Sequence, residues 1–162
     1  MTLIKLLLDE FDEVDYELIA IHSSLEDYRM AFFINQNLPI ILSKSKEEII
    51  VKVNNEEVLF SKFIYDDLSN DLIWTLIQNK NEIITKEKTK NQTLFLDTEV
   101  EIETKVFLLP ELKKVDYFLK IENVQSKLEF KKTISKLLNI DQISTAYKVD
   151  VNTIKSKNNL IF

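Results

Sequence analysis

The alternation of apolar and polar residues predicts a β-strand near the start of the chain and an amphipathic helix directly after it. Residues 14–21 alternate as a strand with one buried face does. The residues that share this face are Val14, Tyr16, Leu18 and Ala20. Ser23 and Ser24 each precede an acidic residue by three places, which is a doubled capping box, and they predict a helix over residues 25–37 that Pro39 ends. Its expected apolar stripe is Leu25, Tyr28, Ala31, Phe32 and Leu38.

The middle of the chain predicts antiparallel β-structure. Residues 49–53 and 58–65 form a predicted hairpin whose turn is Asn54–Asn55, because Asn tolerates positive φ better than other non-glycine residues. A second predicted hairpin pairs residues 58–65 with 72–78. The latter segment also fits helical spacing, but its β-branched and aromatic residues favour a strand. Beyond it we expect a polar turn at 66–71, a polar loop at 79–92 around a short strand at 82–86, and strands at 94–96 and 100–109.

The C-terminal third repeats the order of the opening segment. The tripeptide Val-Asp-Tyr at 115–117 matches the one at 14–16, and each begins a predicted strand. A helix over 126–139 and a strand over 143–149 follow. The residues expected to be buried on this helix are Leu128, Ile134, Leu137 and Leu138. The predicted fold class is α+β: an elaborated ferredoxin-like sandwich of two strand–helix–strand units flanking an antiparallel β insertion, in a single domain over residues 1–162.

The amino-acid composition excludes most common classes of active site. The 162 residues include no glycine, no cysteine and one histidine, His22. Phosphate-binding loops, nucleophile elbows and dinucleotide turns need glycine where the backbone approaches a ligand or takes positive φ. We therefore expect a non-enzymatic protein with no cofactor and no metal. No apolar run approaches the roughly 18 residues of a membrane span. With no cysteine and no cleavable leader pattern, the cytoplasm is the expected compartment.

The charge of the chain is unevenly distributed. Its net charge is −6, yet residues 1–112 carry 11 basic and 22 acidic side chains, whereas residues 113–162 carry 10 lysines and 5 acids. Such asymmetry is typical of a basic segment that binds nucleic acid or an acidic partner. It is equally expected if the two parts pack together and their fields partly cancel. Lys155 and Lys157 are the candidate phosphate-binding residues of the basic part.

One segment carries a resemblance to a known family. Residues 109–121 read LPELKKVDYFLKI, and the chain closes with TAYKVDVNTIKSKNNLIF at 145–162. This pattern resembles the IPExxxVDY family of small Bacteroidota proteins. Leu109 replaces the leading Ile of the motif, and the matching positions are Pro110, Glu111, Val115, Asp116 and Tyr117. We expect the resemblance to extend over the whole chain, with the residues around 82–103 as a lineage-specific insertion. It implies a bacterial protein and supplies no reaction, cofactor or ligand.

The motif residues have a chemical and a structural interpretation. Pro110 fixes φ and can begin a turn, which places Glu111 near backbone N–H groups that favour a carboxylate. Glu111 and Asp116 can pair as acid and base, with His22 as a third member of a small hydrolase or lyase site, or bind a cation. In the structural interpretation Glu111 caps the turn, Asp116 ties down the loop before its strand, and Tyr117 packs.

Elimination leaves protein binding as the predicted function, with a homodimer as the simplest partner. Ten Phe and five Tyr on a β-rich fold suit strand addition at a sheet edge or packing on an aromatic face. The candidate binding residues are Pro110, Glu111, Asp116, Tyr117, Lys155 and Lys157. The alternative is an accessory protein of RNA or ribonucleoproteins that uses the basic C-terminal third. The single Trp74 is expected to pack in the core or, if exposed, to anchor an interface.

Overall fold

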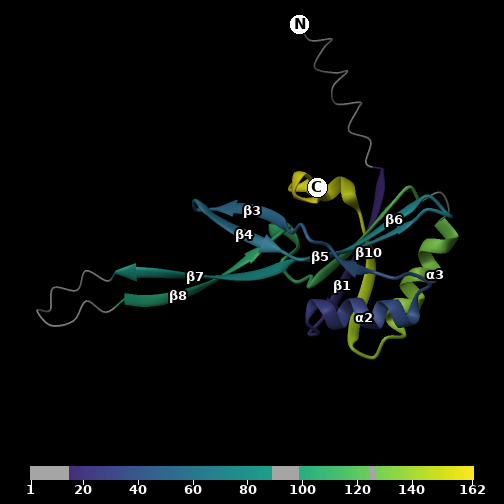
Figure 1. Cartoon of the computed structure of the whole chain (residues 1–162), viewed down its shortest axis with the longest axis horizontal. Helices are drawn as coiled ribbons and strands as arrows, with labels where there is room; N and C mark the ends of the chain where they lie inside the picture. Colours follow the sequence, from purple (N-terminus) through teal and green to yellow (C-terminus); the bar gives the residue numbers. More distant parts are fainter. Residues whose placement is uncertain (1–14, 89–98, 125–126) are drawn as a thin grey trace, which may run out of the picture.

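The centre of the molecule is a six-stranded antiparallel sheet, seen in a computed structural model that describes residues 15–88, 99–124 and 127–162 (Figure 1). In spatial order its strands are β10 (Ile143–Val149), β1 (Tyr16–Ser23), β9 (Tyr117–Glu122), β6 (Leu72–Gln78), β5 (Lys62–Asp67) and β2 (Ser43–Lys44). Two further hairpins pair β3 (Ile49–Val53) with β4 (Glu56–Phe60) and β7 (Lys80–Lys88) with β8 (Glu99–Phe107). With helices α2 (Asp27–Asn37) and α3 (Lys127–Leu138), the described residues form an α+β fold, as predicted.

Strand β1 explains why the sheet has a core on each face. Ile19 and Ile21 point into the first core, on the face that the helices cover, and Leu18 and Ala20 point into the second core, on the opposite face. All four residues are fully buried. The predicted face of Tyr16, Leu18 and Ala20 is confirmed, while Val14 lies outside the described residues. A strand buried on both sides needs apolar residues at consecutive positions, which the sequence LIAI provides.

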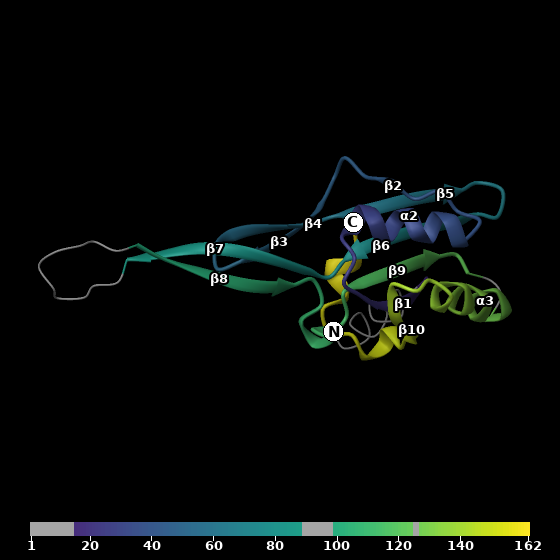
Figure 2. The same cartoon turned by 90° about the horizontal axis from the view of Figure 1, so that it is seen from below.

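Helices α2 and α3 cover one face of the sheet (Figures 1 and 2). The first helix ends where Pro39 predicts. Of its expected stripe, Ala31 and Leu38 are confirmed as buried and Leu25 as partly buried, but Tyr28 and Phe32 are wrong, since both are more than half exposed. The buried positions are Met30, Ala31, Ile34 and Leu38. This set follows helical spacing equally well, and it is the one that packs into the cluster between the helices and the sheet.

The start of α2 also differs from the prediction. Glu26 is the residue before the helix, and no side chain caps the helix there. The Ser23 hydroxyl instead accepts a hydrogen bond from the N–H of Leu25 and donates one to the carbonyl oxygen of Gln142. The doubled capping box is therefore wrong, since Ser23 still belongs to β1 and is used to hold the strand end against the start of β10.

The predicted Asn54–Asn55 turn is confirmed. Asn54 and Asn55 have φ of 50° and 64°, the left-handed pair that a two-residue hairpin turn requires. The strand expected over 58–65 is wrong as one element, because it is interrupted at Ser61 into β4 and β5, which belong to different sheets. The interruption lets β3 and β4 fold over the second face of the main sheet, where Val58 and Phe60 are buried. The hairpin of β5 and β6 is confirmed, and Asp71 takes positive φ in its turn.

The strand predicted at 82–86 is confirmed but is longer than expected, so the loop predicted around it is wrong over residues 80–88, while residues 89–92 lie outside the described residues. Strand β7 runs over nine residues and pairs along its whole length with β8, while the strand predicted at 94–96 lies outside the described residues. The two strands form an arm that extends away from the rest of the molecule (Figures 1 and 2). We call β7 and β8 together the arm.

The C-terminal third follows the predicted order of strand, helix and strand. Leu137 is buried and Ile134 partly buried on α3, but Leu138 is 49% exposed, so that part of the prediction is wrong. Leu138 follows Leu137 directly and therefore faces away from the sheet. The side chain of Leu128 lies outside the described residues. After β10 the chain makes two 3-10 turns, Val151–Thr153 and Lys157–Leu160, which complete the second core through Val151, Ile154 and Leu160.

Candidate functional site

The predicted binding motif forms the connection between β8 and β9. Pro110 occupies the first turn of a short 3-10 helix, Pro110–Leu112, as its fixed φ favours. Leu108 and Leu109, just before it, are fully buried in the second core. Pro110 and Glu111 are exposed, whereas Tyr117 is buried at the start of β9.

A residue that the sequence analysis did not single out holds this connection in place. Asn79 lies between β6 and β7 and is fully buried. Its amide nitrogen donates to the carbonyl oxygens of Leu112, at 3.0 Å, and Val115, at 2.7 Å. Its side-chain oxygen accepts the N–H of Leu109 at 2.9 Å, and its backbone oxygen accepts that of Leu108 at 2.8 Å. All side-chain hydrogen-bonding groups of Asn79 therefore bind the motif connection. An isolated Asn beside a strand gives no sequence signal of such a role.

Glu111 joins the motif to the C-terminal turns. The N–H of Ser156 donates to its Oε1 at 2.8 Å, and the Ser156 hydroxyl donates to its Oε2 at 3.0 Å. Partial burial acts to raise the pKa of Glu111, but these bonds, together with backbone N–H groups of Glu111 and Lys155, outweigh it and lower the pKa below 4.5. The carboxylate is thus held in its charged form beside the turn that begins at Lys157.

Asp116 joins three strands around the same connection. Its Oδ2 accepts the N–H of Ser23 at 2.9 Å, and its Oδ1 accepts a hydrogen bond from Lys80 Nζ at 2.7 Å. Its backbone N–H donates to Ile21 and its carbonyl oxygen accepts the N–H of Asn79. Asp116 therefore continues the pairing of β9 with both neighbours, and its carboxylate anchors the end of β1.

The Tyr117 side chain lies on the face of the sheet that the helices cover. Its hydroxyl donates to the carbonyl oxygen of Leu25 at 2.5 Å, just before α2. Burial raises the pKa of Tyr117 above its ordinary value of 10.0, and the negative charges of Asp27, Asp116 and Glu26 act in the same direction. The phenol therefore stays protonated and acts as a donor over the whole physiological range.

The two motif carboxylates have different partners: Glu111 binds Ser156, whereas Asp116 binds Ser23 and Lys80. His22 Nε2 lies 3.1 Å from the Tyr147 hydroxyl, and the two rings pack 5.5 Å apart. In the ranges 15–88, 99–124 and 127–162, no three His, Asp or Glu side chains come close enough together to hold a metal ion.

The candidate basic residues lie on the docked C-terminal turns. Lys155 is exposed and Lys157 is half-buried, and Lys157 begins the last 3-10 turn.

In the part of the chain that the structure describes, no helix is both long and apolar enough to cross a membrane.

The last residues contact two lysines that the sequence analysis did not consider. Lys62 on β5 and Lys120 on β9 are about 95% buried, and their ammonium groups lie 4.5 and 4.7 Å from the centre of the Phe162 ring. Lys120 also donates to the carbonyl oxygen of Leu160 at 3.0 Å. Buried ammonium groups need such partners, and Lys120 has two more in the Glu122 carboxylate at 3.4 Å and the Tyr16 ring at 4.8 Å.

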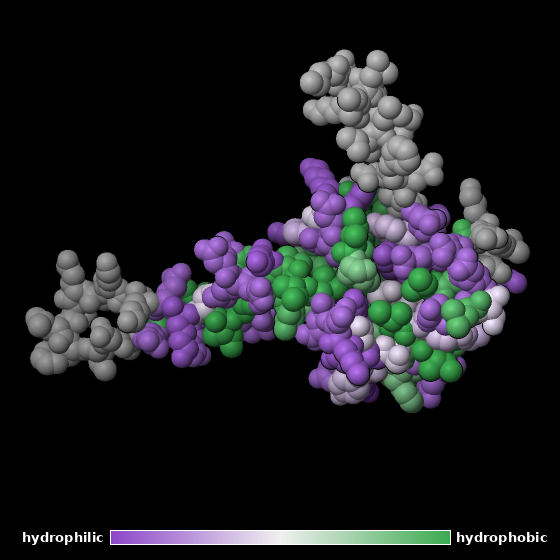
Figure 3. Space-filling model, turned by 45° about the horizontal axis from the view of Figure 1, so that its top comes forward, coloured by the Kyte–Doolittle hydropathy of each residue, from purple (hydrophilic) through white to green (hydrophobic). Residues whose placement is uncertain are grey.

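The arm has two faces of different character. On one face Val106 is buried against the second core, and Ile102 and Val100 become exposed farther out. The other face is charged, and Ile84 lies within it at 63% exposure. Figure 3 shows hydrophobic residues gathered where the arm meets the rest of the molecule, with hydrophilic residues along the arm itself. Exposed aliphatic side chains on a projecting hairpin mark the arm as the candidate interaction surface.

Comparisons with protein-family models, with curated proteins and with solved structures found no match to this chain.

Proposed function

We propose that this chain is a non-enzymatic protein-binding domain that associates with a second copy of itself through the outer edge of β7. The observation that carries the proposal is Ile84, 63% exposed in the middle of a strand on a projecting arm. An exposed strand edge with a central aliphatic side chain is the usual site of strand addition.

The charges beside Ile84 support a two-fold arrangement. Glu82 and Lys86 stand two residues before and two residues after Ile84 and share its face of the strand. When two β7 strands pair antiparallel about residue 84, each Ile84 meets its copy and each Glu82 meets the Lys86 of the other chain. The edge is therefore complementary to itself in charge, with an aliphatic pair at its centre.

The other edge of the arm is less suited to self-association. Strand β8 presents Glu99, Glu101 and Glu103 on the charged face, and antiparallel pairing of two β8 strands brings these acids together. Like charges directly opposite each other destabilise a strand pair. In β7 the two signs alternate around Ile84 instead, which is why we assign the interface to β7.

Sedimentation of the full chain over a range of concentrations tests this proposal. We expect a reversible dimer in the wild type and a monomer in Ile84→Lys. The matched control is Ile50→Lys, because Ile50 is 56% exposed on the neighbouring hairpin β3–β4 but lies outside the proposed edge. A wild type that stays monomeric at every concentration, or an Ile84→Lys variant that dimerises as the wild type does, contradicts the proposal.

We further propose that the main sheet is an elaborated ferredoxin-like arrangement and that the chain belongs to the cytoplasmic bacterial proteins of the IPExxxVDY family. The neighbours β10, β1, β9 and β6 support the first part, since α2 follows β1 and α3 connects β9 to β10. Strands β5 and β2 then extend this sheet, and the two hairpins are the insertions. The motif spacing at 109–117 supports the second part.

A further inference from the structure

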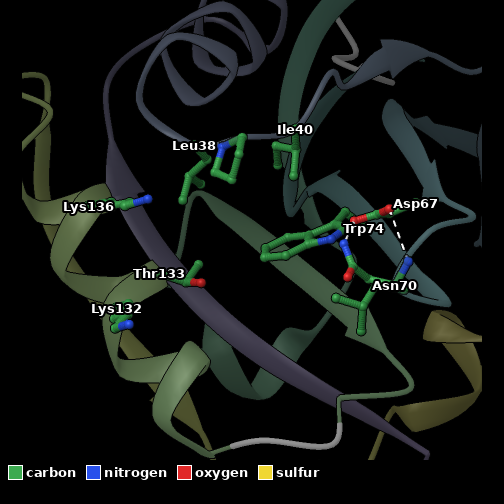
Figure 4. Close-up of a pocket in the computed structure, with 10 residues that line it drawn as sticks. Leu38, Ile40, Asp67, Asn70, Trp74, Lys132, Thr133 and Lys136 are labelled. Atoms are coloured by element: carbon green, nitrogen blue, oxygen red, sulfur yellow. Dashed lines mark hydrogen bonds between the residues drawn. The ribbon is translucent and has the colours of Figure 1, made fainter.

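A cavity of about 350 Å³ lies at the end of the helical layer, away from the arm and from the motif connection (Figure 4). Its walls come from the segment after α2, from the turn between β5 and β6, and from α3. Leu38, Ile40, Leu72 and Trp74 make the apolar part of its lining. This volume is at the lower end of the range of about 300–1,000 Å³ that is typical of small-molecule sites.

The indole of Trp74 has an unused hydrogen-bond donor at this cavity. Trp74 is 92% buried, since only 8% of it is exposed, and its Nε1 has no hydrogen-bond partner among the described residues. Buried Trp N–H groups usually find an acceptor, and leaving one unpaired is destabilising. Figure 4 shows the ring between the α3 side chains and the side chains of Asp67 and Asn70. An acceptor on a bound molecule would satisfy this N–H.

The charges around the cavity favour an anion. Lys132 and Lys136 are four residues apart on α3, so they lie on the same face of the helix, and both line the cavity. Asp67 is the acidic residue of the lining, and its two oxygens already accept hydrogen bonds from the backbone and side chain of Asn70, at 3.3 and 2.7 Å. The ammonium groups of the two lysines are therefore the charged groups with donors available to a ligand.

We propose that this cavity binds a small carboxylic acid with an apolar body. Its carboxylate meets Lys132 and Lys136, its body packs on the aliphatic lining and the Trp74 ring, and one oxygen of the same carboxylate accepts the Trp74 N–H. This ligand site is separate from the β7 edge, so it stands or fails independently of self-association.

Titration with 3-phenylpropionate tests the site, because this probe combines a carboxylate with an apolar ring. Trp74 is the only tryptophan of the chain, so its fluorescence reports binding at the cavity without a label. We expect a saturable change of the emission and a matching calorimetric isotherm. The uncharged 3-phenylpropanamide, which has the same shape, should bind at least tenfold more weakly.

Variants of the cavity lining sharpen this test. Lys132→Gln/Lys136→Gln should weaken binding of 3-phenylpropionate at least tenfold, whereas Lys131→Gln, on the same helix but outside the lining, should bind as the wild type does. Trp74→Phe keeps an aromatic ring without the N–H, and calorimetry should show weaker binding of the probe by the folded variant. No saturable binding of the probe, or equal binding by the wild type and the double lysine variant, overturns the proposal.

Discussion

The side chain of Asn79 binds the backbone of Val115 across 36 positions of sequence, with a distance of 2.7 Å from its amide nitrogen to the carbonyl oxygen of Val115. The same side chain also binds Leu109 and Leu112, so one buried amide fixes both ends of the motif connection. The conformation of residues 109–116 thus depends on a residue outside the motif.

Replacement of Asn79 by Ala should be strongly destabilising. The substitution leaves the buried N–H of Leu109 and two carbonyl oxygens without their partner, and each unpaired buried group costs about 1–3 kcal/mol. We expect the free energy of unfolding, measured with urea, to fall by about 3–5 kcal/mol. Asn81→Ala is the matched control, because the Asn81 side chain makes two backbone hydrogen bonds, to Leu59 and Glu82, but both are in exposed positions. Equal effects of the two substitutions would contradict the role of Asn79.

Glu111 should make the stability of the protein depend on acid pH. Its pKa is lowered in the folded state, so its contribution is complete above the unfolded pKa of about 4.3 and is lost as the pH falls through the folded value. Glu111→Gln should therefore reduce the decline of stability below about pH 4.3. NMR titration of the carboxyl group, with Ser156→Ala as the comparison, should show a higher pKa in the variant. The same pKa in both proteins would exclude the Ser156 hydroxyl as a cause, since Ser156→Ala keeps the backbone N–H.

Tyr117 should have the opposite pH dependence, at the alkaline end. Because its pKa is raised on folding, its contribution is complete below 10.0 and is lost as the pH rises above that value. Tyr117→Phe removes the bond to Leu25 and should cost about 1–2 kcal/mol at neutral pH. It should also flatten the alkaline decline of the unfolding temperature. Tyr147→Phe serves as a control at a residue that is 42% exposed, and a similar alkaline effect there would argue against Tyr117.

Phe162 should stabilise the fold through the two buried lysines. Its ring lies within 5 Å of both ammonium groups, and a cation–π contact contributes about 0.5–2 kcal/mol, depending on its exposure to water. We expect Phe162→Ala to lower the free energy of unfolding by about 1–3 kcal/mol. A double-mutant cycle with Lys62→Met should give a coupling energy of about 0.5 kcal/mol or more. Additive effects in that cycle would contradict the proposed contact.

The sequence predicted those parts of the fold that depend on residues adjacent to one another along the chain. Asn54 and Asn55 predict their turn because positive φ is a property of the residue itself. Tyr28 and Phe32 were assigned to the wrong face of α2, because two phases of the helical pattern were possible and only packing on the sheet selects between them. The interruption at Ser61 was missed for the same reason, since it follows from the position of a separate hairpin.

The interactions of the candidate site were less predictable than its position. The motif at 109–117 marks a segment with specific contacts, but the partners Asn79, Ser156 and Lys80 lie 30 or more residues away in the sequence. Nothing in a single sequence pairs such distant residues. The cavity beside Trp74 was beyond prediction as well, because its walls come from three separate segments.

Exchange of charges between Glu82 and Lys86 tests the proposed self-association most directly. In the two-fold pairing, Glu82→Lys places two lysines opposite each other, and Lys86→Glu does the same with two acids, so each variant alone should dimerise about tenfold more weakly. Lys86 Nζ also lies 3.7 Å from a carboxylate oxygen of Glu101 and 3.8 Å from one of Glu99 within its own arm. Loss of the dimer in Lys86→Glu alone could therefore also result from loss of these ion pairs within the arm.

Mixing the two variants resolves this ambiguity, because a Glu82→Lys chain facing a Lys86→Glu chain regains both opposite-charge pairs. Sedimentation of the equimolar mixture should show a heterodimer at the wild-type concentration range, while each variant alone stays largely monomeric. A mixture that sediments as the average of its two components would contradict self-association through β7.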